Sequence, residues 1–198
     1  MLRPRYPLRT RRLLLRPFQP GDLEGLYAYQ SQPEVARFLA WEPRTLEESR
    51  VFLRQKMDAA TLEREGDWLV AAVVAADSGA LMGEVNLQWS SRAHCQGEIG
   101  YVLNPDFHGH GYATEAAAEG LRLGFEELGL HRIVGRIDAR NEASARVLER
   151  LGMRREAHLR ENELVKGEWS DEVVYAMLRR EWEARPEPAH DAGAAVGE

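Results

Sequence analysis

The strongest chemical signal in the chain is a short glycine-rich segment that also carries two histidines. Its residues are His108, Gly109, His110, Gly111, Tyr112, Ala113 and Thr114. Two spaced glycines let the backbone approach a ligand closely, and the unpaired N–H groups in the first turn of a following helix point at an anion. The segment therefore predicts a loop that binds a diphosphate group.

Two common kinds of phosphate loop do not match this segment. A nucleoside-triphosphate loop ends in Gly-Lys followed by Ser or Thr, whereas Gly111 is followed by Tyr112. A dinucleotide-binding loop needs a third glycine after a long parallel strand unit, and the segment has neither. His108 and His110 are two residues apart, but no third ligand is near them in the sequence, so we expect loop histidines and no metal site.

Hydrophobic periodicity and turn residues predict the elements that position this loop. The expected strands are residues 12–17, 68–76, 81–89, 96–103, 132–138, 154–165 and 170–179. The expected helices are residues 22–30, 46–65, 112–128 and 142–151, with a short helical turn after Pro33. The order β-α-α-β-β-β-α-β-α-β-β predicts a mixed α/β (α+β) domain, whose last two strands form a hairpin around Lys166 and Gly167.

Composition limits the class of protein. The chain has 198 residues, 44% of them hydrophobic, which predicts one domain over residues 1–185 and a disordered acidic tail over 186–198. A net charge of −6 argues against a nucleic-acid partner. Cys95 is the only cysteine, so no intrachain disulfide forms. No apolar run is long enough for a membrane span or a signal peptide, so we expect a cytoplasmic protein without a membrane partner.

Two segments together resemble the GNAT superfamily of acyltransferases. The loop is similar to that superfamily's acetyl-CoA motif, with His108 in place of a Gln or Arg and with Gly111 and Ala113 at the small-residue positions. Residues 141–144, Asn-Glu-Ala-Ser, followed by Val147, are similar to the helix that lines the pantetheine arm in such enzymes. Further segments resemble the RimJ/RimL branch, which acetylates protein N-termini: residues 10–18, 33–35, 98–101, 111–116 and 169–171.

The resemblance implies the GNAT fold, in which a mixed central sheet is splayed between the expected strands 96–103 and 132–138. It also implies acetyl-CoA as co-substrate and no metal. In this fold the loop would hold the diphosphate, and the pantetheine arm would lie between a strand and a helix. The implied pantetheine contacts are the backbone groups of Tyr101, Val102 and Leu103, and the helix residues Asn141, Ser144 and Val147.

The implied reaction is direct attack of a primary amine on the acetyl thioester. In register with RimL-type enzymes, Glu163 falls where a base has been proposed, and Glu98 lies on the strand that enters the loop. Glu84, on the neighbouring strand, is a third candidate, and for each of the three the alternative is a solvated or ion-paired strand carboxylate. Ser144 is the candidate donor to the leaving thiolate, because Leu148 stands where many members carry a tyrosine acid.

The resemblance implies the reaction more firmly than the acceptor. We expect the α-amine of a protein or peptide N-terminus. Transfer of an acetyl or succinyl group to a small amine, such as a polyamine or an aminoglycoside, is an alternative reading. A CoA-binding regulatory module without turnover is another, although Ser144 and the placed carboxylates weigh against it. A homodimer is also possible by analogy with relatives.

Overall fold

The computed structural model describes residues 1–185, and the expected acidic tail lies outside them. Within these residues one sheet runs in the order β1-β2-β3-β4-β5-β6-β8-β7. Its strands are β1 (Leu8–Arg9), β2 (Leu13–Arg16), β3 (Trp68–Ala75), β4 (Leu81–Ser91), β5 (Gln96–Leu103), β6 (Arg132–Asp138), β7 (Arg154–Val165) and β8 (Glu168–Leu178). The helices are α1 (Leu23–Gln30), α2 (Pro33–Ala36), α3 (Leu46–Asp58), α4 (Tyr112–Arg122), α5 (Glu142–Arg150) and α6 (Arg179–Glu183). None of these helices is long and apolar enough to cross a membrane.

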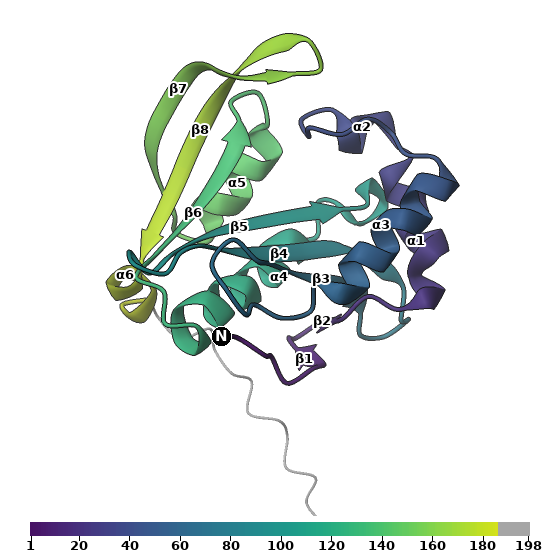
Figure 1. Ribbon diagram of the computed structural model, residues 1–198, viewed down its shortest axis with the longest axis horizontal. Coiled ribbons are helices and arrows are strands. Elements are labelled where there is room, and N and C mark those ends of the chain that lie inside the picture. Colours follow the sequence, from purple (N-terminus) through teal and green to yellow (C-terminus); the bar gives the residue numbers. More distant parts are fainter. Residues whose placement is uncertain (186–198) are drawn as a thin grey trace, which may run out of the picture.

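Helices cover both faces of the sheet, which explains the nearly continuous apolar sequence of β3. Ala71 and Val73 of β3 belong to the larger core cluster, which includes residues of α4 and α5. Ala72 and Val74 point the other way, into a smaller cluster beneath α1 and α3. Figure 1 shows α1 and α3 on one side of the sheet and α4 on the other.

The sheet is antiparallel except where β5 meets β6. These two strands pair in parallel only over three residues, from Gln96 with Arg132 to Glu98 with Val134. Beyond Glu98 they separate, and Figure 1 shows β6, β7 and β8 turned away from the rest of the sheet. The mixed α/β fold and the splay between the expected strands 96–103 and 132–138 are therefore confirmed.

The two long predicted helices differ most from the sequence prediction, while several other elements begin or end one or two residues away from their expected bounds. The helix expected over 46–65 ends at Asp58; beyond it Leu62 pairs with Leu2 in an isolated bridge, and the Asp67 carboxylate accepts the N–H groups of Glu63 and Arg64 in a turn. The helix expected over 112–128 changes at Leu123 into one π turn that ends at Glu127. Two short elements, β1 and α6, were not predicted.

Candidate active site

The separation of β5 from β6 opens a cleft of about 870 Å³. The second half of β5, the loop before α4, the first turns of α4 and α5, and β6 form its walls. The segment around α2 and the β7–β8 hairpin close its far end. The cleft lies at the carboxyl ends of the two parallel strands, which is the usual position of a ligand site in an open α/β sheet.

The glycine-rich loop has the backbone geometry of an anion site. Gly109 and Gly111 have φ values of +82° and +80°, in the left-handed region that favours glycine, and Gly111 directly precedes α4. The first intrahelical bond runs from Glu115 N–H to Gly111 O (3.1 Å), so the N–H groups before it are available to an anion. The Thr114 hydroxyl oxygen is buried at this turn without a hydrogen-bond partner among the described residues. These features fit the diphosphate end of CoA.

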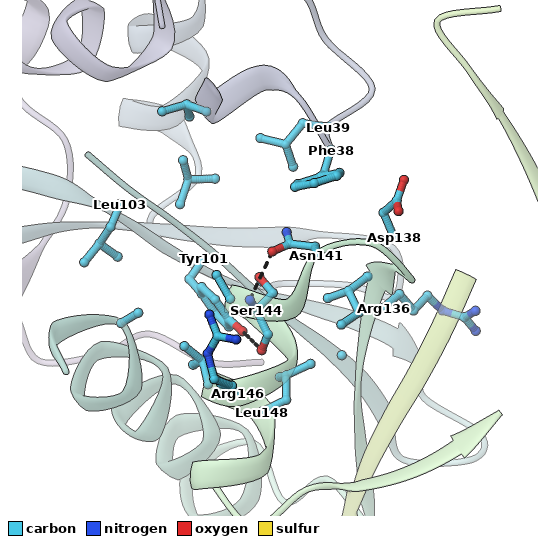
Figure 2. Close-up of a pocket in the computed structure, with 18 of the residues that line it drawn as sticks. Phe38, Leu39, Tyr101, Leu103, Arg136, Asp138, Asn141, Ser144, Arg146 and Leu148 are labelled. Carbon is cyan, nitrogen blue, oxygen red and sulfur yellow. Dashed lines mark hydrogen bonds between the residues drawn. The ribbon is translucent and has the colours of Figure 1, made fainter. Parts of the chain in front are cut away.

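The opposite wall is built around Ser144, in the first turn of α5. Asn141 precedes α5, and its side-chain oxygen accepts the backbone N–H of Ser144 (3.1 Å), while the Tyr101 hydroxyl donates to the Ser144 carbonyl (3.0 Å; Figure 2). The burial that raises the pKa of Tyr101 keeps this hydroxyl protonated as a donor. Leu148 is buried one turn further along α5 and contacts β6 at Gly135, so no tyrosine acid is present at that position.

A carboxylate cluster lies where the two strands separate. Glu98 is the last residue of β5 that pairs with β6, and its carboxylate is 3.4 Å from the Arg136 guanidinium of β6. Arg136 also donates to both carboxylate oxygens of Glu172 on β8 (3.2 Å each). Burial raises the pKa of Glu98; Arg136 opposes this shift, whereas Glu172 and Glu163 reinforce it. Glu98 is thus a half-buried carboxylate with enhanced basicity.

The structure brings most of the residues predicted from sequence into this one cleft. The lining residues among them are Glu98, Tyr101, Val102, Leu103, His108, Gly109, Gly111, Tyr112, Ala113, Thr114, Asn141, Ser144, Val147 and Glu163. His110 is absent from the lining and instead offers its carbonyl to Arg12 (2.9 Å). Among residues 1–185, no group of three or more His, Cys, Asp or Glu side chains is arranged to hold a metal ion.

Glu84 lies away from the cleft, in a buried polar group between β4 and the helices. Its carboxylate accepts the Lys56 ammonium (2.7 Å) and the Tyr29 hydroxyl (2.8 Å). The structure therefore gives Glu84 the ion-paired role that was the alternative to a base. The sequence analysis missed Arg136 and Glu172, whose pairing across β6 and β8 has no local sequence signal.

Known proteins resemble this chain in sequence and in fold. The family model for an acetyltransferase (GNAT) domain matches residues 12–154. An uncharacterized N-acetyltransferase of Bacillus subtilis, YnaD, is 34% identical over 87% of this chain and 97% of its own length. A GNAT-family acetyltransferase from Bacillus anthracis has a crystal structure that superposes with a TM-score of 0.80 at 33% identity, covering 88% of this chain and 99% of that one.

Two further relatives are named for different acceptors. A putative ribosomal N-acetyltransferase of B. subtilis, YdaF, is 36% identical over 53% of this chain and 57% of its own length. The spermidine N(1)-acetyltransferase of Escherichia coli K12 is 24% identical over 85% of this chain and 87% of its own length. GNAT enzymes transfer an acetyl group from acetyl-CoA to an amine. Because the family model covers most of the chain and YnaD aligns almost end to end, the chain belongs to the GNAT acetyltransferase family and is an N-acetyltransferase.

Proposed function

We propose that this enzyme acetylates the α-amine of a protein or peptide N-terminus. The observation that carries the proposal is the half-buried Glu98 carboxylate, with a raised pKa, at the point where β5 and β6 separate. A base must lie near the amine that attacks, and geometry comes before pKa in choosing it. Glu98 meets both conditions if the thioester end of the co-substrate lies between the two strands.

The two walls of the cleft divide the binding of acetyl-CoA between them. The glycine-rich loop and the first turn of α4 would receive the diphosphate through backbone N–H groups. The free backbone edge of β5 from Tyr101 to Leu103 would pair with the pantetheine amides, because β6 no longer covers it. The Asn141 oxygen caps α5, and its amide N–H groups are available to the arm.

In the proposed reaction the amine nitrogen attacks the thioester carbonyl carbon, a C–N bond forms and the C–S bond breaks. Glu98 accepts the proton that the amine loses, directly or through water, with Glu163 as the other candidate. The Ser144 hydroxyl donates a hydrogen bond to the leaving thiolate. Because Leu148 carries no ionisable group, the proton for the free thiol comes from solvent or from the protonated base.

The strength of this base favours an α-amine. Removing the proton of an α-amine at pH 7 costs about 1 kcal/mol, whereas a lysine or polyamine amine costs about 4–5 kcal/mol. Arg136 partly cancels the effect of burial on Glu98, so the carboxylate is a moderate base. A moderate base is strong enough to assist an α-amine and is weak for a lysine or polyamine amine.

One observation favours a small polycation as the second candidate acceptor. The charged residues that line the cleft include more acids than bases, and the acids gather around β5 to β8 and α2. These acids are Glu34, Glu98, Asp138, Glu163, Asp171 and Glu172. A site of this charge attracts cations, and the relative named for spermidine acetylation supports the same reading.

Release of CoA thiol from acetyl-CoA separates these candidates. The amine panel contains matched peptides with free and with acetylated N-termini, spermidine and an aminoglycoside. Release with free but not with blocked peptides is the expected result. Release with small amines alone would replace the proposal with the second candidate. No release with any amine, while acetyl-CoA binding is detected by calorimetry, would refute both acceptor assignments.

A further inference from the structure

A partly buried carboxylate lies in the turn of α4 that would receive the diphosphate. Glu115 is the fourth residue of α4, and its side chain is 16% exposed. Its carboxylate accepts hydrogen bonds from the Thr10 hydroxyl (2.6 Å), the Arg12 backbone N–H (2.8 Å) and Arg12 Nε (2.7 Å). Burial works against ionisation, but these hydrogen bonds outweigh it and lower the pKa of Glu115. The carboxylate is therefore negatively charged at neutral pH.

Arg12 connects this carboxylate to the glycine-rich loop. Its Nη1 donates to the carbonyl of His110 (2.9 Å), and its guanidinium lies over the Tyr112 ring, 4.4 Å from the centroid. Its Nη2 is 3.6 Å from the position that a Cβ on Gly111 would take. The guanidinium thus contacts His110 and Tyr112 and lies beside Gly111, although Arg12 directly precedes β2 and is 98 residues from His110 in the chain.

The position of Glu115 conflicts with the binding of a polyanion. A helix N-terminus attracts negative charge only within its first turn, where a fixed carboxylate competes with the ligand and repels it. The Arg12 charge cancels that repulsion, and its hydrogen bond occupies the His110 carbonyl in the loop. An ionised Glu115 without Arg12 would leave a net negative charge at the loop.

We propose that Arg12 is a positioning residue for acetyl-CoA: it neutralises Glu115 and holds the loop in the conformation that binds the diphosphate. The inference rests on the proposed role of the loop. It concerns only the part of acetyl-CoA that carries phosphate, so a second acetyl donor without phosphate separates it from a general effect on folding.

The test compares kcat/KM for acetyl-CoA and for S-acetylpantetheine, which lacks the diphosphate and the adenosine. We expect R12M to raise the KM for acetyl-CoA roughly tenfold, since it removes one ion-pair partner from a partly buried helix terminus. Its kcat/KM for S-acetylpantetheine should stay within about twofold of the wild-type value. R12K keeps the charge and should lie near the wild type. R3M removes an arginine from an exposed ion pair with Glu63 and serves as the matched control.

The double variant R12M/E115Q gives the decisive comparison. If Arg12 cancels the charge of Glu115, removing both charges should recover the electrostatic part of the lost acetyl-CoA affinity, whereas the part due to the hydrogen bond to the His110 carbonyl stays lost. An equal loss for both donors in R12M, or no recovery in the double variant, would overturn the proposal and leave Arg12 a structural residue. If the wild type had the same kcat/KM for S-acetylpantetheine as for acetyl-CoA, the assignment of the diphosphate loop itself would be wrong.

Discussion

Replacing Glu98 with glutamine tests whether this carboxylate is the base. The substitution preserves size and removes the ability to accept a proton. Glu98 lies at the last position where β5 pairs with β6, and its side chain is 25% exposed. Arg136 keeps both hydrogen bonds to Glu172 in E98Q, so the neighbouring guanidinium stays in place.

The size of the effect follows from the two proton equilibria involved. General-base catalysis contributes roughly 10²–10⁴-fold, and we expect the low end at pH 7 because Arg136 moderates the basicity of Glu98. An α-amine has a pKa near 8, so roughly a tenth of it is neutral at pH 7 and nearly all of it at pH 9.5. A neutral acceptor needs less help from a base. The loss in E98Q should therefore shrink from roughly 10²-fold at pH 7 to roughly tenfold or less at pH 9.5.

The assay is kcat/KM for a peptide with a free N-terminus, measured from pH 5 to 9.5. In the wild type, activity should rise as Glu98 loses its proton, and because burial raises the pKa of Glu98, this rise should lie above the usual pKa range of a glutamate. In E98Q that limb should disappear, and only the rise due to the amine should remain. E163Q is the matched comparison. A loss in E98Q that stays constant with pH would refute the role of base, and a pH-dependent loss confined to E163Q would transfer that role to Glu163.

Three other substitutions test the remaining parts of the site. Gly111→Trp should abolish acetyl-CoA binding, measured by calorimetry, while the circular dichroism spectrum stays native. The reason is that a side chain at a residue with φ +80° blocks the loop and strains only that turn. Unchanged binding would contradict the assignment of the diphosphate loop. Ser144→Ala should lower kcat more than it raises the KM for acetyl-CoA, because the Asn141 side chain accepts the backbone N–H of residue 144 and this cap is kept in the variant. Equal changes in kcat and KM would make Ser144 a positioning residue. Asp138→Asn should destabilise the fold by about 1–2 kcal/mol at pH 7 in urea unfolding. Hydrogen bonds, chiefly from Arg140, lower the pKa of Asp138 to about 2, so its stabilisation is complete above about pH 4 and is lost as pH falls toward 2. A difference from the wild type that persists at pH 2 would rule out this ionic origin.

The sequence predicted the parts of the fold that depend on neighbouring residues. The bounds of β5, β6 and β7 agree with the expected strands 96–103, 132–138 and 154–165, because turn residues delimit each of them. The hairpin turn at Lys166 and Gly167 was predicted as well, and both residues have positive φ. The overestimated helix over 46–65 had a suitable local pattern, but the bridge from Leu62 to Leu2 and the capture of two N–H groups by Asp67 hold the segment after Asp58 in a different conformation.

The parts of the site that escaped prediction are contacts between segments far apart in the chain. Arg136 and Glu172 meet because β6 pairs with β8 and not with its sequence neighbour β7. Lys166 at the hairpin tip donates to the carbonyl of Ala36 (2.8 Å), which joins the hairpin to α2 across the cleft. Periodicity in one segment carries no information on such pairings, so the walls of the acceptor end could be found only from the fold.

The splay of the sheet explains why both halves of the reaction meet at one place. Each of the two parallel strands leads into a helix, β5 into α4 and β6 into α5. Leu148 packs so closely on β6 that a Cβ on Gly135 would lie 2.8 Å from one of its methyl groups, which fixes α5 to its own strand. Because β5 and β6 separate after Glu98, α4 and α5 diverge with their strands, and the N-terminal turns of the two helices face each other across the gap. The turn of α4 that we propose binds the diphosphate and the Ser144 turn of α5 thus form opposite walls of one cleft, with the Glu98 carboxylate at the point where the strands separate.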